Sequence, residues 1–362
     1  MREFSTPDWI VMMSPKSHPR ELVVEITTLC NMNCIHCFRK AALDLKPCSM
    51  DLKFFKNILS EAIENNVGRI VFSGWGEPLI HPEIQYMIKM CRDLGLEVAI
   101  NTNGSRIDEL IDALVKYVDE IYISLDAATP RVYNIVRQPT MFSSIIQSIS
   151  KLVSIKQVRG QIKPVIKTLF TVTSLNIVDV EYFLKLAVEL GVNEVVFTSA
   201  IPYSDQDVGC LSSTKCIEDL STQLKKALEE FKEFSLRITA PQTQYTASCP
   251  FASKRALFIR CDGAVTPCIH YAYSWTPNIL GINRYIKKVV LGYIGKDRLI
   301  DIWRNRYARI FYRLYFKRIP SCLACSLVEY CGKTRENTAD CLGGEPNCGH
   351  CPYYHSLSYC PL

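Results

Sequence analysis

The sequence predicts an α/β protein with a parallel sheet, followed by a smaller cysteine-rich domain. Between residues 20 and 200, short runs rich in β-branched residues alternate with longer helical patterns, and six such runs are almost continuously apolar. Strands of this kind are buried on both faces, as in parallel sheets covered by helices. From about residue 240 onward, cysteine, proline, glycine and tyrosine become frequent and the apolar periodicity weakens.

The strands and helices can be placed from these patterns. The six strands are expected at Leu22–Thr27, Arg69–Ser73, Glu97–Asn101, Glu120–Leu125, Val165–Val172 and Glu194–Thr198. Helices are expected at Leu52–Asn65, Pro82–Leu94, Arg106–Tyr117, Met141–Ile155, Val178–Leu190 and Thr214–Phe234. Gly95 and Gly191 follow two of them, where glycine commonly ends a helix. Farther along, a hairpin is expected over Leu257–Cys268, turning at Asp262-Gly263, and a helix over Asp297–Phe316.

Length and composition limit the possible functions. A chain of 362 residues can form one large domain and a smaller one, which we place at residues 20–235 and 236–362, after an N-terminal extension over residues 1–19. The net charge of +6 is modest and gives no support to nucleic-acid binding. Residues 1–19 lack the pattern of a signal peptide, and no stretch approaches 18 uninterrupted apolar residues. We therefore expect a cytoplasmic protein without a membrane span.

The 17 cysteines are unevenly distributed. In a chain without an export signal, cysteines are more often ligands than disulfide partners. Three form a triplet near the N-terminus and ten lie between Cys249 and Cys360. The other four are scattered and are interpreted as ordinary buried or partly buried thiols: Cys48, Cys91, Cys210 and Cys216.

Cys30, Cys34 and Cys37 form a CxxxCxxC triplet directly after the first strand. A structural zinc site closes its coordination with four protein ligands, and a cubane cluster usually takes four thiolates. Three thiolates at this tight spacing can hold three irons and leave the fourth open to a small molecule. A zinc site completed by His36 is the alternative, although His36 stands between two of the cysteines.

Polar segments follow the next three strands, at Ser73–Pro78, Asn101–Gly104 and Ser124–Asp126. The carboxyl ends of parallel strands meet at one edge of the sheet, where α/β barrels carry their active sites. We expect these segments and the cysteine triplet to form one site.

Together, the triplet and these segments resemble the signature of the radical S-adenosylmethionine (radical SAM) enzymes over about residues 20–230. The segment Ser73–Pro78 is similar to the family's GGEP motif, with Trp75 at the position of the first glycine. The next two segments are similar to its TNG and SLD elements. The resemblance implies a partial (β/α)6 barrel, a catalytic [4Fe–4S] cluster on Cys30, Cys34 and Cys37, and reductive cleavage of SAM to a 5′-deoxyadenosyl radical.

The same resemblance implies a set of SAM-binding residues, and one position departs from the family. Glycine in the GGEP-like motif would let backbone carbonyls approach the cationic ligand closely, and an arginine suits the SAM carboxylate because its contact can be bidentate. His36 stands where an aromatic residue commonly stacks near adenine. The implied SAM contacts are Gly74, Gly76, Glu77, Thr102, Ser124 and Arg137.

The C-terminal cysteines resemble the SPASM extension of radical SAM enzymes, which binds two auxiliary [4Fe–4S] clusters. The resemblance rests on Cys322-x2-Cys325-x5-Cys331 and on Asp262-Gly-Ala-Val-Thr-Pro-Cys268. Cys261 is the weakest candidate ligand, because it stands at the hairpin turn. A zinc ribbon remains an alternative for the CxxC pairs. The candidate ligands, whose division between two clusters stays open, are Cys249, Cys268, Cys322, Cys325, Cys331, Cys341, Cys348, Cys351 and Cys360.

The last motifs, among them Asn347-Cys-Gly-His-Cys351, resemble radical SAM maturases associated with tungsten-containing aldehyde oxidoreductases. This implies maturation of such an enzyme or its pterin cofactor, with a protein, peptide or cofactor-precursor substrate and a ferredoxin or flavodoxin as electron donor. The alternatives are modification of a ribosomally made peptide and a zinc-binding interaction protein.

No catalytic acid or base is assignable. Ile269 follows Cys268 where relatives that oxidise sulfatases carry Asp. His270 could relay a proton, but we favour a structural role for it.

Overall fold

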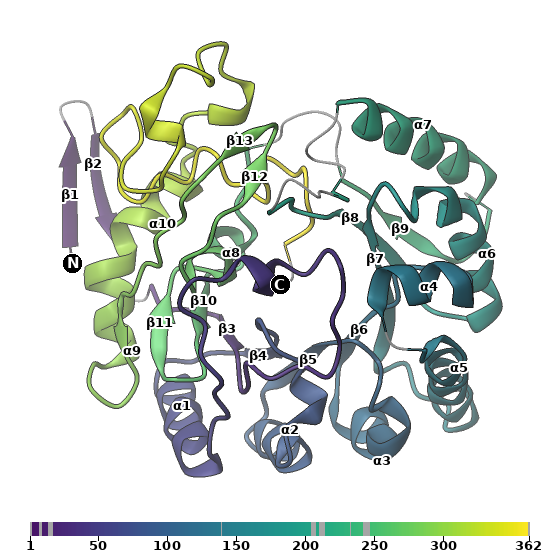
Figure 1. Cartoon of the computed structure of the whole chain (residues 1–362). Coiled ribbons are helices and arrows are strands. Elements are labelled where there is room, and N and C mark those ends of the chain that lie inside the picture. The colour runs from purple at the N-terminus through teal and green to yellow at the C-terminus, as the bar shows by residue number, and fades with distance from the viewer. Residues whose placement is uncertain are drawn as a thin grey trace.

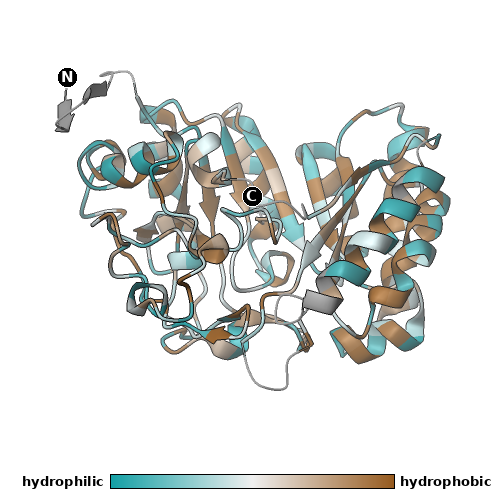
Figure 2. Ribbon diagram, turned by 90° about the horizontal axis from the view of Figure 1, so that it is seen from above, coloured by the Kyte–Doolittle hydropathy of each residue, from teal (hydrophilic) through white to brown (hydrophobic). Residues whose placement is uncertain are grey.

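The structure, a computed structural model, describes residues 2–6, 9–13, 17–138, 140–203, 208–209, 214–231, 233–241 and 247–360. Its main element is a ten-stranded sheet with the strand order β14-β11-β10-β3-β4-β5-β6-β7-β8-β9. The sheet follows an arc, and most helices of the first 230 residues lie along its outer side (Figure 1). The strands are mostly apolar, whereas the helices alternate apolar and polar residues (Figure 2).

The six predicted parallel strands are confirmed and pair in chain order. Their residues are almost all buried, as the apolar runs indicated. The strands are β3 (Glu21–Val24), β4 (Arg69–Phe72), β5 (Glu97–Thr102), β6 (Glu120–Ser124), β7 (Val165–Val172) and β8 (Glu194–Ser199). A further strand, β9 (Arg237–Thr239), continues the parallel sheet beyond β8.

The predicted helices are found within a few residues of their expected ends. They are α1 (Leu52–Glu64), α2 (Ile84–Asp93), α3 (Ile107–Tyr117), α5 (Phe142–Val158), α6 (Val180–Leu190) and α7 (Thr214–Glu230). The helix expected over Asp297–Phe316 is interrupted: α9 (Leu299–Asp301) and α10 (Ala308–Tyr315) flank a π-helical segment at Ile302–Tyr307. No helix in the described part of the chain is both long and apolar enough to cross a membrane.

Helix α4 (Pro130–Arg137) was not predicted, although its start signal is present in the sequence. The side chain of Thr129 accepts a hydrogen bond from the backbone N–H of Val132, and Pro130 occupies the first turn. Both are typical of a helix N-terminus. The helix ends at Arg137, which it carries toward the triplet.

The predicted hairpin is confirmed as β10 (Ala256–Ile259) and β11 (Ala264–Thr266). At its turn Gly263 has a φ of +83°, a conformation that other residues rarely adopt, so the backbone favours glycine there. Strand β10 also pairs in parallel with β3, which was not predicted. The remaining strands and α-helix are β1 (Arg2–Thr6), β2 (Trp9–Met13), α8 (Pro250–Ser253), β12 (Asn278–Ile279), β13 (Ile282–Asn283) and β14 (Gly292–Tyr293).

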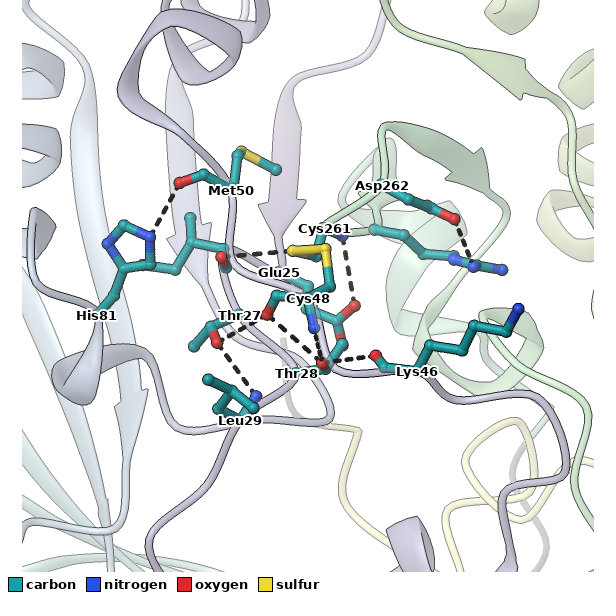
Figure 3. The surroundings of a disulfide bond; sticks show 12 residues. Glu25, Thr27, Thr28, Leu29, Lys46, Cys48, Met50, His81, Cys261 and Asp262 are labelled. Atoms are coloured by element: carbon teal, nitrogen blue, oxygen red, sulfur yellow. Dashed lines mark hydrogen bonds and ion pairs between the residues drawn. A yellow bond between two sulfur atoms is a disulfide. The ribbon is translucent and has the colours of Figure 1, made fainter.

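The interpretation of Cys48 as an ordinary thiol is wrong, because Cys48 forms a disulfide with Cys261 across 213 residues of sequence (Figure 3). Cys216 is also disulfide-bonded, so the same interpretation is wrong there. Cys91 is a buried free thiol, as expected. Cys210 lies outside the described residues. The sequence could not indicate the Cys48–Cys261 pair, because the contact depends on how the hairpin docks on β3.

Candidate functional site

The triplet and the strand-end motifs line one cavity at the carboxyl ends of the parallel strands. This is the site that the sequence predicts, and Ile269 also reaches its wall. The predicted residues that line it are Cys30, Cys34, Cys37, Gly74, Gly76, Glu77, Thr102, Ser124 and Arg137. A second cavity of about 200 Å³ adjoins it and shares Cys34, Cys37, Ser124 and Arg137. Its other walls include the ends of β7 and β8 and the C-terminal residues Tyr353, Ser358 and Tyr359.

The triplet loop is held by hydrogen bonds from the end of β3. The hydroxyl of Thr28 donates to the carbonyl of Lys46 at 2.8 Å and accepts from the backbone N–H of Cys48 at 2.8 Å. The guanidinium of Arg39 donates to the carbonyl of Thr28 at 2.7 Å. Burial raises the pKa of Cys37 to about 11. Since metals bind the thiolate, loading this loop releases protons.

The two glycines of the GGEP-like motif are required by packing within the protein. A Cβ on Gly74 would lie 2.6 Å from Cγ of Glu25, and one on Gly76 would lie 2.2 Å from the backbone oxygen of Thr27. Real Cβ atoms do not come that close to other heavy atoms. These glycines therefore let the β4 loop pass directly over the end of β3, a reason that the sequence did not indicate.

Glu25 is a site-supporting residue that sequence analysis missed. Its buried carboxylate accepts a hydrogen bond from the backbone N–H of Trp75 at 2.7 Å and another from the hydroxyl of Tyr273. Burial raises the pKa of Glu25 to about 7. A charged residue in the otherwise apolar run of the first strand was the available signal, because such a residue needs buried partners.

Glu77 and Thr102 are brought together by hydrogen bonding. The hydroxyl of Thr102 donates to Oε1 of Glu77 at 2.7 Å, and the backbone N–H of Asn103 donates to Oε2 at 2.6 Å. The N–H of Leu79 also donates to Oε1, at 2.9 Å. Burial raises the pKa of Glu77. Its carboxylate thus ties the loop after β4 to the loop after β5.

Arg137 is 5% exposed and contacts three groups at the cavity wall. Its Nε lies 3.0 Å from Oδ2 of the fully buried Asp126, and its Nη1 donates to the sulfur of Cys34 at 3.2 Å. Its Nη2 donates to the carbonyl of Ser124. These contacts fix the guanidinium beside the triplet.

His36 contacts Asp126, with its Nε2 3.4 Å from Oδ2. Burial lowers the pKa of His36 to about 4, although the Asp126 carboxylate opposes that shift. The imidazole is therefore neutral near pH 7. His36 lies in the wall of the second cavity, and its expected place beside adenine stays a prediction.

The C-terminal thiols fall into two groups. Burial raises the pKa of Cys268, and so does the negative charge of four thiols around it, those of Cys249, Cys348, Cys351 and Cys360. The pKa of Cys322 is raised to about 11 by burial and by Cys341 and Cys331. Cys325 closes the same short turn, with its N–H donating to the carbonyl of Cys322. Within the described residues, no three His, Cys, Asp or Glu side chains could hold a single metal ion.

An aromatic cluster joins the GGEP-like motif to the segment after Cys268. The ring of Trp75 lies 4.6 Å from that of Phe38 and 5.8 Å from that of Trp275, and the Trp75 N–H donates to the carbonyl of Ile269. Trp275 in turn lies 5.2 Å from the ring of His270.

His270 is buried within this aromatic cluster. Among the described residues, neither of its ring nitrogens has a hydrogen-bond partner, and burial lowers the pKa of His270 to about 3. The imidazole is therefore neutral and packs as an aromatic ring, which agrees with a structural role.

Comparison with known families supports this description. Residues 24–187 match the Radical SAM superfamily, and residues 249–326 match the SPASM iron–sulfur cluster-binding domain. The chain is 28% identical, over 94% of its length and 97% of the relative's, to the tungsten-containing aldehyde ferredoxin oxidoreductase cofactor-modifying protein of Pyrococcus furiosus. It is 26% identical to the PqqA peptide cyclase of Methylorubrum populi, over 82% of the chain and 74% of the cyclase.

Solved structures share the fold. The native anSMEcpe structure with bound AdoMet and the Cp18Cys peptide is 17% identical, with a TM-score of 0.65 over 94% of this chain and 96% of that one. Streptococcus suis SuiB bound to S-adenosylmethionine is 17% identical, with a TM-score of 0.60 over 87% of this chain and 72% of that one.

Proposed function

Because the chain belongs to the radical SAM enzymes and carries a SPASM-type domain, we propose that it cleaves SAM reductively to mature a tungsten-containing oxidoreductase or its pterin cofactor. The main support is the single cavity that gathers Cys30, Cys34 and Cys37 with the motifs of three strand ends. The triplet offers three thiols, which suits a cluster whose fourth iron stays open to a small molecule. When bound, that cluster would supply the electron that generates the 5′-deoxyadenosyl radical.

The chain's own residues would orient SAM and exclude water. Glu77 and Arg137 are fixed by their hydrogen bonds before any ligand binds, so the walls of the cavity are preorganised. Trp75, which is 2% exposed, closes one wall. The adjoining cavity, bounded by Tyr353 and Tyr359, is the proposed substrate space.

In the same proposal, the two thiol groups hold two auxiliary [4Fe–4S] clusters. Cys322, Cys325, Cys331 and Cys341 take one cluster, and four of the five thiols of the group formed by Cys268 and its four neighbours take the other. In this proposal, residues 20–235 form the domain that binds SAM and residues 236–362 form the domain that holds the auxiliary clusters. Residues 1–19 are an N-terminal extension. A cytoplasmic location, with its reducing thiol pool, suits such free thiols, whereas the Cys48–Cys261 disulfide has to resist reduction there.

Peptide modification is the second candidate. It is favoured by the similarity to the PqqA peptide cyclase and by the fold shared with SuiB, whose complex with precursor peptide SuiA is also similar.

The test begins with anaerobic reconstitution with iron and sulfide. Three clusters require about twelve irons with matching sulfide, whereas a zinc protein would hold zinc without labile sulfide. With dithionite, the loaded protein should convert SAM to 5′-deoxyadenosine. Cys30→Ala should abolish this product, and Cys351→Ala should retain it while losing turnover of the substrate. Cys91→Ala, at a buried thiol outside all three groups, is the control. A Cys30→Ala protein that still forms 5′-deoxyadenosine would refute the proposal.

A tungsten oxidoreductase isolated without this protein should lack the modification that it gains when the two are combined. A precursor peptide modified in its place would favour the second candidate.

A further inference from the structure

Positive charge is concentrated in one segment of the C-terminal domain. Residues 284–318 contain eleven Lys or Arg and two Asp, a net charge of +9, although the whole chain carries +6. The remaining residues together are therefore slightly acidic. The whole-chain charge conceals this asymmetry, which is why sequence analysis gave it no weight. Such a charge imbalance is typical of a surface that binds an anionic partner.

The segment lines a groove of about 610 Å³, here called the basic groove. One wall is the helical stretch that includes α10, and the other is the loop around Cys341. Of the residues that line it, all within the described part of the chain, five are cationic and Glu345 is the one acid. The cationic residues are Lys287, Lys288, Arg306, Arg309 and Arg313.

Three of these cations have carboxylate partners. Lys288 lies 3.0 Å from Asp44, Arg306 lies 3.2 Å from Asp297, and Arg313 is paired with Asp340.

Lys287 and Arg309 are exposed, and no carboxylate of the described residues lies within ion-pair distance of either side chain. They are therefore available to an anionic partner. Tyr307 of the same helical stretch is fully buried and does not contribute to this surface.

The basic groove is in direct contact with the loop that carries Cys341. A Cβ on Gly344 would lie 1.8 Å from the guanidinium carbon of Arg313, so the arginine lies flat against the backbone of that loop. Asp340, which pairs with Arg313, also accepts hydrogen bonds from the N–H groups of Leu342 and Gly344 at 2.9 Å. Cys341 itself is exposed, as is Cys325 of the same thiol group.

We propose that the basic groove docks a small acidic one-electron carrier protein, beside the exposed thiol group of Cys341. In each encounter the carrier is oxidised by one electron and this protein is reduced by one. Electrostatic complementarity of this kind speeds association and makes it sensitive to salt. The groove shares no lining residue with the SAM cavity or with the cavity beside it, which favours a redox partner over the reacting substrate. This inference rests on the proposed function, since it takes the Cys341 group to hold a redox cluster.

The experiment uses the fully loaded protein and, as probe, a bacterial ferredoxin with a net negative charge. Lys287→Glu/Arg309→Glu should weaken ferredoxin binding by on the order of tenfold at low salt and reduce its salt dependence. The matched control, Lys225→Glu, changes an exposed lysine on α7, across the sheet from α10 (Figure 1), and should leave binding within twofold. Lys287→Glu alone, at an exposed position, should give a smaller loss and serves if the double variant does not fold.

Dithionite separates the two proposals because it reduces the protein without a carrier. The groove variants should form 5′-deoxyadenosine from SAM at the wild-type rate with dithionite and more slowly with reduced ferredoxin. A wild-type protein that never cleaves SAM contradicts the proposed function, while ferredoxin binding still tests the groove. Ferredoxin affinity unchanged in the double variant overturns the docking proposal. The docking proposal is also overturned if the double variant keeps its ferredoxin affinity but loses binding of pyrophosphate, a short RNA or the substrate polypeptide.

Discussion

The guanidinium of Arg137 lies 3.0 Å from the carboxylate of Asp126, and both side chains are buried beside the cysteine triplet. Removal of one partner from a buried ion pair leaves an uncompensated charge. Arg137→Ala should therefore lower the free energy of unfolding by about 3–5 kcal/mol, measured by urea denaturation.

Arg159→Ala is the matched control, because Arg159 pairs with Asp112 at the same 3.0 Å on an exposed surface. Exposed pairs contribute about 1 kcal/mol or less. Equal losses in the two variants would show that the Arg137 pair is not effectively buried. Arg137→Lys, which keeps the charge but loses the planar fork, should restore part of the stability and little of the SAM affinity.

Glu25 should make stability depend on pH. Its folded-state pKa is raised to about 7 by burial, from 4.5. Between these values the folded protein binds more protons than the unfolded chain, so the stability that this group contributes is present at low pH and is lost as the pH rises through 7. Glu25→Gln should remove that decline. The measurement is the difference in unfolding free energy between wild type and variant from pH 4.5 to 7.5, which cancels the opposing contributions of His36 and His270. A difference that does not change with pH would contradict the shifted pKa.

Gly76 tests whether the GGEP-like loop tolerates any side chain. In Gly76→Ala the new methyl group would meet the backbone of Thr27 and Leu29, at 2.2 Å and 2.6 Å, and the backbone cannot rotate away. Overpacking of this kind costs about 1–3 kcal/mol. Thermal unfolding should show that loss, and SAM affinity should fall with it because the loop lines the SAM cavity. In Gly68→Ala the nearest atom is 4.0 Å away, and both properties should stay near wild type.

The disulfide between Cys48 and Cys261 should stabilise the protein. It joins the segment after the triplet to the hairpin turn, 213 residues away. Disulfides that close long loops typically contribute about 2–4 kcal/mol. Cys48→Ser/Cys261→Ser should lose about that much under non-reducing conditions and match wild type in excess reductant. Alkylation of the unfolded wild-type chain should leave both thiols unmodified unless it is first reduced. Labelling of either cysteine without reduction would contradict the bond.

The sequence predicted the local features of this protein well. The six parallel strands and their helices were found because apolar periodicity is a local property, and the cavity residues were found because parallel strands end at a common edge. Helix α4 was missed despite its Thr129–Pro130 start, since its eight residues leave a short periodic pattern. The pairing of β10 with β3, by contrast, depends on contacts between residues more than 230 positions apart.

The cysteines show the same division between local and distant information. The triplet is recognised from its spacing alone. The division of nine C-terminal cysteines into two groups, with Cys261 in a disulfide, becomes visible only in the folded chain, where Cys268 lies near Cys348. The charge of Glu25 in an apolar run indicated that it needs buried partners, but not that these would be Trp75 and Tyr273 on distant segments.

The parallel pairing of β10 with β3 makes the two halves of the chain one hydrogen-bonded sheet. Removing everything after residue 235 would uncover the backbone amides and carbonyls along one side of β3, and exposed strand edges of this kind recruit other chains. Residues 1–235 produced alone should therefore self-associate rather than behave as a separate, monomeric barrel. Evolutionary exchange of the C-terminal domain would need a replacement strand as well as a replacement set of ligands.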